Sequence, residues 1–389
     1  MNPKEKFIIR SSILELAETG TPRNISIDEK IGMDHKEKGN ERTLNIWDCI
    51  TALGAQLSRP PYDPYREIIN LGITVGRRHC PTKVILSMPL VIYDNGIKIE
   101  ETTLESLHAA LNWLAAKDNT RLGLVSENRT KNGRNYPHFE RVNEKSTIED
   151  DNHPEGLVLQ YNNDKSLQFI TDMRKQFSGP ILVEIDDGFE KYMGSLLDVG
   201  VDAVIADTIK LTNKEKYKGK HATAVIHDVR GAINQYYAGK ENDGALLLVA
   251  GDLNNTGRIV KAVALGADVI GYSTSLLIAN AANHYENPCN VNSIPERICR
   301  HIQATKGELK GVPAALGYSD FYNISPADLR TSSIEASLQA DIAIEGVDKT
   351  YRQIMEESTT GKTIVEWMGF DKDGKQDQNK KYSQIFNDK

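Results

Sequence analysis

The chain has 389 residues, of which 39% are hydrophobic and 26% are charged. These fractions are ordinary for a globular protein and exclude collagen, coiled coil and wholesale disorder. The formal net charge of −7 argues against broad binding to nucleic acid or to anionic lipid, although one local basic pocket for a phosphate is compatible with it.

No apolar run reaches the ~20 residues that span a bilayer, and no apolar signal core follows the charged N-terminus. The cysteines Cys49, Cys80, Cys289 and Cys299 form no CxxC pair and are expected to be reduced thiols. The sequence therefore predicts a cytoplasmic protein that binds neither membrane nor nucleic acid.

Residues 1–80 are predicted to form an N-terminal helical extension. Apolar residues between 8 and 16 recur at helical spacing, and the stretch 44–57 suits a second amphipathic helix. Pro60, Pro61 and Pro64 then end helical structure, because proline cannot continue a helix.

Residues 81–280 alternate short apolar runs with helical stretches. Eight runs are predicted to be strands: 84–92, 122–125, 157–160, 181–185, 203–206, 222–226, 246–249 and 268–270. Runs without polar alternation are typical of parallel strands buried on both faces. Eight of them alternating with helices indicate a TIM (β/α)8 barrel in the α/β class. A doubly wound open sheet is the alternative, but the Gly-rich first turn typical of it is absent.

Residues 281–370 are predicted to form a C-terminal helical subdomain of loop and helices packed on the barrel, with one helix over 295–304. Residues 371–389 begin with a long polar run and are predicted to form a disordered tail.

Two glycine loops follow the last two predicted barrel strands. In barrels, the loops after strands seven and eight build a phosphate site from backbone N–H groups and a helix N-terminus. The residues expected to bind a phosphate-bearing small molecule are Gly251, Asp252, Asn255, Thr256, Gly257, Gly271, Tyr272, Ser273 and Thr274. The alternative is that these are ordinary tight turns that close the barrel.

These loops carry a resemblance. The stretches 250–258 and 271–279 resemble A-D-G-G-L-R-T-G-R and G-F-G-T-A-A-L-I-A in the FMN-binding barrel domain of glutamate synthase. With weaker matches on either side, the resemblance covers about residues 84–340. It identifies the chain as a divergent member of that family, and it implies an FMN cofactor held by the loop residues named above.

The sequence also departs from the family. The family has a lysine near the flavin on its fourth strand, and the alignment places Glu184 there. The loop after the third strand is nearly deleted at 160–164, and the S-G-H-D-G-G loop after the fifth strand is replaced by residues 206–211. The catalytic residues are therefore unknown, with Glu184, Asp207 and His227 as weak candidates.

The resemblance also concerns metal centres. The three iron–sulfur cysteines of the family fall closest to Ala282, Cys289 and Ile294 in this sequence. One thiolate cannot hold a cluster that needs three, so we expect no iron–sulfur cluster, and we expect no other metal site.

The leading hypothesis is an FMN-binding, glutamate-synthase-like oxidoreductase of altered substrate. We expect no glutaminase activity, because Met1 is followed by Asn2 and no cysteine lies near the start. The alternative is a catalytically degenerate barrel that serves another protein subunit as a partner or regulator, or that binds another phosphorylated ligand. A phosphate-binding lyase or isomerase that uses Asp186 or Asp207 is a third possibility. The protein is expected to be a homo-oligomer.

Overall fold

The fold is that of a computed structural model, which describes residues 16–21, 46–54, 59–94, 99–127, 133–143, 154–241, 243–273 and 293–359. The predicted tail 371–389 lies outside these residues, as do Thr274, Ala282 and Cys289.

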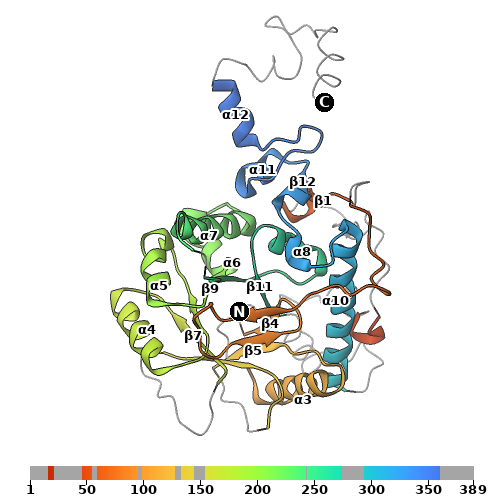
Figure 1. The fold of residues 1–389 in the computed structure, drawn as a ribbon, viewed down its shortest axis with the longest axis vertical. Coiled ribbons are helices and arrows are strands. Elements are labelled where there is room, and N and C mark those ends of the chain that lie inside the picture. Colours follow the sequence, from red (N-terminus) through yellow and green to blue (C-terminus); the bar gives the residue numbers. More distant parts are fainter. Residues whose placement is uncertain are drawn as a thin grey trace, which may run out of the picture.

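Eight parallel strands form a closed barrel at the centre of the molecule (Figure 1). In chain order they are β4 (Leu90–Tyr93), β5 (Gly123–Ser126), β6 (His138–Arg141), β7 (Gly156–Gln160), β8 (Ile181–Glu184), β9 (Ala203–Asp207), β10 (Leu246–Ala250) and β11 (Val269–Tyr272). Strand β11 pairs with β4 and closes the ring. The predicted TIM barrel is therefore confirmed.

Two of the predicted strands were wrong in detail. The stretch 222–226 begins helix α7 (Ala222–Tyr237), and β6 was not predicted at all. The run 84–92 divides into β3 (Val84–Leu86), which lies outside the barrel ring, and β4. The predicted number of strands agreed with the barrel because one false strand replaced one missed strand.

Helices surround the barrel (Figure 1). They are α3 (Glu101–Lys117), α4 (Asp164–Gln176), α5 (Met193–Val199), α6 (Thr208–Thr212), α7, α8 (Thr256–Ala264) and α10 (Ile294–Leu316), with short 3-10 turns η2 (Phe189–Lys191) and η3 (Glu215–Tyr217). The helix predicted over 295–304 is thus longer, and it packs mainly along α3.

Side chains alternate between the barrel interior and the helix layer, as the two-residue period of strands requires. The interior holds Val91, Val125, Phe139, Val158, Leu182, Ala203, Ile205, Leu248, Ala250 and Val269. The Phe139 ring fills the space beside Gly123 and Gly156, where an added Cβ would overlap it. The interior is therefore packed, and ligand chemistry is restricted to its open end.

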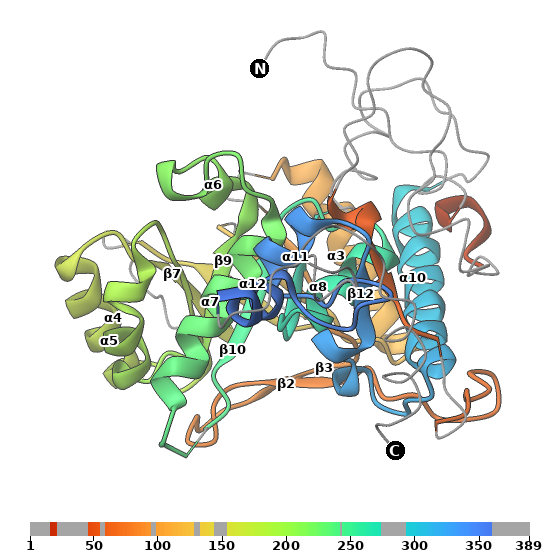
Figure 2. The same ribbon diagram turned by 90° about the horizontal axis from the view of Figure 1, so that it is seen from above.

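An antiparallel hairpin of β2 (Ile73–Val75) and β3 closes the end of the barrel at which the strands begin. Seen from above, this hairpin and α6 lie on opposite sides of the barrel (Figure 2). Buried Arg77 holds the hairpin in place: its backbone N–H donates to Asp202 Oδ1 at 2.7 Å and its Nε to Asp243 Oδ2 at 2.7 Å.

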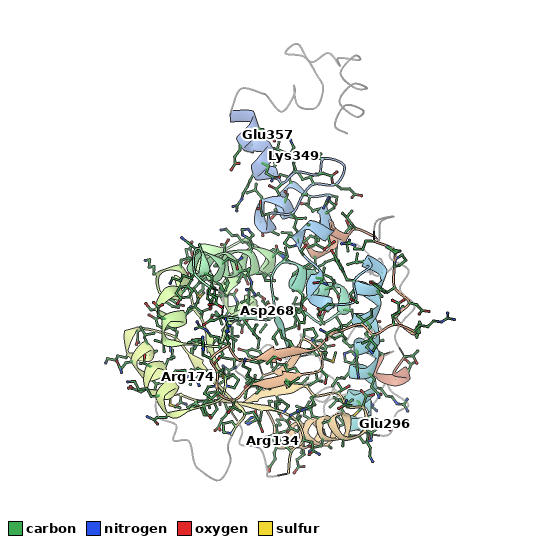
Figure 3. All side chains as sticks on the ribbon, in the orientation of Figure 1. Arg134, Arg174, Asp268, Glu296, Lys349 and Glu357 are labelled. Atoms are coloured by element: carbon green, nitrogen blue, oxygen red, sulfur yellow. The ribbon has the colours of Figure 1, made fainter. Side chains whose placement is uncertain are left out.

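Segments that precede and follow the barrel in the chain meet in a terminal unit. After η1 (Ile46–Cys49), β1 (Ile50–Ala52) pairs antiparallel with β12 (Leu329–Thr331), so the predicted helix over 44–57 is wrong within the described residues. The unit continues through α11 (Ile334–Ala340), which packs on α7, to α12 (Tyr351–Thr359). Turns η4 (Phe321–Asn323) and η5 (Pro326–Asp328) connect it to α10. Lys349 and Glu357 form an ion pair of 2.8 Å at its far end (Figure 3).

Candidate functional site

Polar side chains gather on the inner face where the barrel strands end. Arg141 ends β6, Glu184 ends β8 and Asp207 ends β9, each in step with the interior residues of its own strand. Tyr93 at the end of β4 belongs to the interior cluster itself. Barrels carry their chemistry at this end, so these four side chains define the mouth cluster.

Glu184 is the centre of the mouth cluster. It is 1% exposed, and its Oε2 accepts hydrogen bonds from Arg141 Nη1 at 2.6 Å and from the Tyr93 hydroxyl at 3.1 Å. Its Oε1 forms an ion pair with Lys210 of α6. Arg141 also pairs with Asp94 at 2.7 Å. The Glu184 carboxylate therefore faces the inside of the barrel, and it is paired with two cations.

The charges around Glu184 decide its protonation state. Burial raises the pKa of this carboxyl, but the charges and hydrogen bonds of Arg141 and Lys210 outweigh burial, so its pKa lies below the ordinary value. Burial and the charge of Glu184 raise the pKa of the Tyr93 hydroxyl well above its ordinary value. At neutral pH Glu184 is ionised and Tyr93 is a hydrogen-bond donor.

Asp207 caps the N-terminus of α6. Its Oδ1 accepts hydrogen bonds from the backbone N–H groups of Ile209 and Lys210 at 3.0 and 3.1 Å. Burial raises its pKa, and so does the nearby charge of Glu184, while the two N–H groups and the Lys210 ammonium act in the opposite direction with a smaller combined effect.

The two glycine loops begin side by side, as expected from their positions after adjacent strands. Ala250, the last residue of β10, pairs with Gly271 of β11 and with Asp207 of β9. A Cβ on Gly271 would lie 2.8 Å from Ala250 Cβ and 3.1 Å from Tyr93 Cγ. Gly251 has a φ of +147°, in a region that favours glycine. The glycines therefore bring the described starts of both loops to the edge of the mouth cluster.

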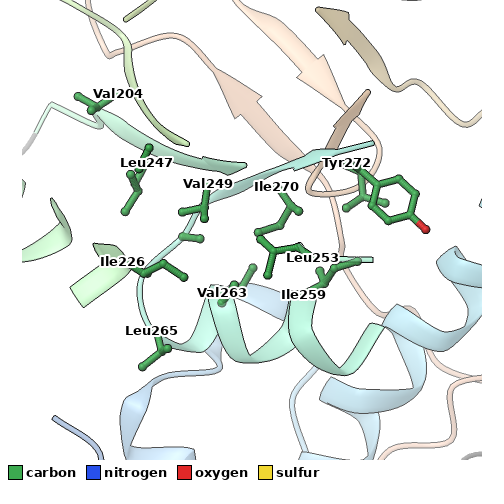
Figure 4. Close-up of a cluster of buried hydrophobic side chains, with 14 of the residues drawn as sticks. Val204, Ile226, Leu247, Val249, Leu253, Ile259, Val263, Leu265, Ile270 and Tyr272 are labelled. Carbon is green, nitrogen blue, oxygen red and sulfur yellow. The ribbon is translucent and has the colours of Figure 1, made fainter. Parts of the chain in front are cut away.

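The first loop leads from β10 into the N-terminus of α8. Asn255 caps it by accepting from the Arg258 N–H at 2.9 Å, whereas the N–H groups of Thr256 and Gly257 have no acceptor among the described residues. Asn254 Oδ1 is buried and likewise accepts no hydrogen bond within the described chain. Helix α8 itself is held by apolar contacts of Ile259 and other side chains with β10 and β11 (Figure 4).

Several side chains predicted to bind the phosphate already have partners. The Thr256 hydroxyl donates to Glu308 of α10 at 2.5 Å, and Asp252 pairs with Arg258. Tyr272 Oη lies 2.5 Å from His301 Nε2, in the layer outside the barrel. Ser273 follows β11 and belongs to the described chain, whereas Thr274 lies outside it. An anion at this place would thus meet backbone N–H groups rather than these side chains.

Other site expectations need correction. His227 is not at a strand end: it lies within α7 in the outer layer, with Nδ1 3.3 Å from Asp228 Oδ1. Because β6 was missed, the strand of Glu184 is the fifth of the barrel and not the fourth. The loops assigned to the third and fifth strands, at 160–164 and 206–211, follow the fourth and the sixth for the same reason.

Sequence reasoning missed the cations of the site. Arg141 lies in the unpredicted strand β6, whose sequence His-Phe-Glu-Arg holds a single large apolar residue. Lys210 was visible three residues after Asp207, but only the turn into α6 directs it back towards Glu184. A basic residue soon after a strand end was the one available signal.

The comparisons with known proteins agree with this architecture. No protein-family profile matches the chain. A glutamate synthase large subunit-like protein of Rhizobium meliloti (strain 1021) is 21% identical over 409 aligned positions, covering 80% of this chain and 90% of that protein. The resemblance predicted from the glycine loops is confirmed.

Two solved structures that superpose on this chain are of a flavocytochrome. The flavin-binding domain of baker's yeast flavocytochrome b2 superposes with a TM-score of 0.50 at 12% identity, covering 73% of this chain and 76% of that one. A doubly substituted flavocytochrome b2 with sulfite bound gives a TM-score of 0.51 at 10% identity, covering 73% and 77%. At such identities the likeness concerns the fold.

The described residues contain no group of three or more His, Cys, Asp or Glu side chains arranged to hold a metal ion. Within the same residues, no helix combines the length and the apolar character needed to cross a membrane.

Proposed function

We propose that this barrel binds FMN and acts as a glutamate-synthase-like oxidoreductase on an altered substrate. The observation that carries the proposal is the pairing of Ala250 with Gly271, which sets both glycine loops and the start of α8 beside the mouth cluster. The glutamate synthase-like relative and the flavin-binding neighbours support it.

The residues present fit the phosphate of FMN. The backbone N–H groups of Thr256 and Gly257 are open donors at a helix N-terminus, where the helix dipole favours an anion. Buried Asn254 Oδ1 would accept a hydroxyl hydrogen of the same ligand. FMN would supply the two-electron acceptor of the reaction.

The side chains of the mouth cluster supply positive charge and a hydrogen-bond donor to a bound ligand. Arg141 and Lys210 hold two positive charges at the open end of the barrel, where they stabilise negative charge that develops on a ligand. Tyr93 offers a hydroxyl donor, and the Glu184 carboxylate fixes the three donors in place. Two carboxylates among these cations argue for a substrate other than that of glutamate synthase.

The proposal includes no iron–sulfur cluster. Ile294, the residue nearest the third cysteine position, begins α10 and offers no thiolate. Iron and acid-labile sulfide should be well below one equivalent in protein purified without oxygen, and a stoichiometric amount would contradict this part.

A second candidate is a barrel that has lost catalysis and serves as a partner or regulatory subunit. One observation favours it: the cations of the mouth are paired with carboxylates, and the Thr256 hydroxyl is engaged by Glu308. Such a barrel would be folded and stable while having no measurable affinity for FMN.

A charge placed at the start of α8 tests the phosphate site. Gly257→Glu adds a carboxylate at the second residue of the helix, where acids stabilise helices but repel a phosphate. The FMN affinity should fall at least about tenfold, or 1.4 kcal/mol, while the affinity for riboflavin, which lacks the phosphate, stays unchanged. Fluorescence quenching of both flavins measures this.

Thr102→Glu is the matched control. It adds the same charge at the second residue of α3, an exposed position at the start of another barrel helix. Its affinities should equal those of the wild type. Equal losses of FMN affinity in both variants would show an effect of net charge. They would contradict the proposal that the phosphate binds at the N-terminus of α8.

A further inference from the structure

Two carboxylates of the mouth cluster, those of Glu184 and Asp207, lie on neighbouring strands. They differ in their hydrogen-bond and ion-pair partners. Glu184 pairs in register with Ile205, and Asp207 follows two residues later on the same inner face. When the environments of two nearby acids differ in this way, one stays ionised and the other becomes able to exchange a proton.

Glu184 is the ionised member. Both of its oxygens are occupied, Oε1 by Lys210 and Oε2 by Arg141 and Tyr93. A proton on Glu184 would break an ion pair in a buried place, where unpaired charge is costly. Its part is to orient the cations.

Asp207 is different because only one of its oxygens is used. Oδ1 accepts from two backbone N–H groups, while Oδ2 accepts no hydrogen bond from the described chain. The charged and titratable groups around it are Lys210 on α6, Glu184 on β8 and Tyr93 on β4. Burial and the charge of Glu184 favour its neutral form, which is consistent with a group that holds a proton.

We propose that Asp207 is the proton-exchanging residue of this site, taking up a proton on Oδ2 when an anionic ligand binds at the mouth and passing it to or from that ligand. The inference rests on the proposed function for the place of the ligand. A helix cap is the ordinary role of such a residue, and Oδ1 fulfils it here, which leaves Oδ2 for the ligand.

The proton transfer balances without another reactant. Solvent supplies the proton that forms a bond to Oδ2 when the ligand binds. When this Oδ2–H bond breaks, its electron pair stays on Oδ2, and the proton forms a bond to a lone pair of the ligand atom. Asp207 is then again a carboxylate, stabilised by the N–H groups of Ile209 and Lys210 and by the Lys210 ammonium. In the reverse sequence, the proton of the ligand returns to Oδ2 and then to solvent.

Asp186, the other acid considered at this end of the barrel, does not suit this role. Lys214 Nζ lies 2.8 Å from its Oδ1 and 2.9 Å from its Oδ2. The Lys214 charge and hydrogen bond outweigh burial and lower its pKa. Asp186→Asn is therefore the matched control, because it removes the same kind of side chain from the same end of the barrel.

The first measurement needs no ligand. Asp207→Asn keeps an N-cap, since Asn caps helices as well as Asp does. Infrared titration of the wild type should show one protonated carboxyl band that persists to higher pH than the others. The band should be absent from Asp207→Asn and present in Asp186→Asn. A wild-type titration identical to that of Asp207→Asn would overturn the proposal.

The second measurement uses FMN as the probe. Calorimetry in two buffers of different ionisation enthalpy gives the protons taken up per FMN bound. The uptake should be smaller in Asp207→Asn than in the wild type and unchanged in Asp186→Asn. Equal uptake in all three proteins overturns the coupling of Asp207 to the ligand. If the wild type does not bind FMN, the proposed function fails, while the infrared titration still decides the protonation of Asp207.

Discussion

At the scale of single residues, the Glu184 carboxylate holds the side chains of the mouth cluster in place. A buried carboxylate is stable there only because Arg141, Lys210 and Tyr93 surround it. From the sequence, Glu184 could be placed in a barrel strand. Its partners could not be identified, because Arg141 comes from an unpredicted strand.

Removing the charge of Glu184 should cost stability. Glu184→Gln removes the counter-charge of half-exposed Lys210 and one of the two counter-charges of buried Arg141, which keeps Asp94, and should lower the free energy of unfolding by about 3 kcal/mol. Glu241→Gln, in the exposed pair with Arg78, should change it by less than about 1 kcal/mol. Urea denaturation of both variants measures this. Equal effects would show that the mouth cluster contributes no more than a surface pair.

The pH dependence of the same variant has a definite sign. Glu184 has a lowered pKa in the folded state, so its contribution is present above the ordinary carboxyl pKa of about 4.3 and is lost as the pH falls through the folded-state pKa. The stability difference between wild type and Glu184→Gln should therefore shrink below about pH 4. A difference that grows on acidification would contradict the assignment of Glu184 as ionised.

At the scale of elements, the contact between β10 and β11 places the starts of the two glycine loops. Gly271 lets Ala250 and the Tyr93 ring approach β11 more closely than a side chain would allow. This unit was predicted well because its glycines and its apolar runs are local signals. β6 gave no such signal, and the apolar start of α7 was mistaken for a strand because short apolar runs suit both.

Gly271→Ala should therefore disturb the site and the core together. Its Cβ would be forced against Ala250 and Tyr93, and overpacking of this kind costs about 1–3 kcal/mol. Gly231→Ala in α7, where nothing lies within 4 Å, should instead stabilise the protein by up to about 1 kcal/mol. Thermal denaturation compares the two. A neutral Gly271→Ala would mean that β10 and β11 are not in close contact.

At the scale of the whole molecule, the barrel could be predicted and the terminal unit could not. Parallel strands buried on both faces leave apolar runs that are recognisable one by one. The ladder of β1 with β12, in contrast, joins residues about 280 positions apart, as in the hydrogen bond from Thr331 Oγ1 to the Cys49 carbonyl. No local pattern in 44–57 indicates such a distant partner. The helical spacing of its apolar residues therefore led to the wrong prediction of a helix.

The proposed function depends on binding of FMN by its phosphate at the open end of this barrel. Titration of the wild-type protein with FMN and with riboflavin examines this step alone, since the two ligands differ only in that phosphate. We expect saturable binding of FMN at least about tenfold tighter than that of riboflavin, because charge-assisted hydrogen bonds to the Thr256 and Gly257 N–H groups are lost without the phosphate. Equal affinities, or no binding of FMN by the folded protein, would contradict it.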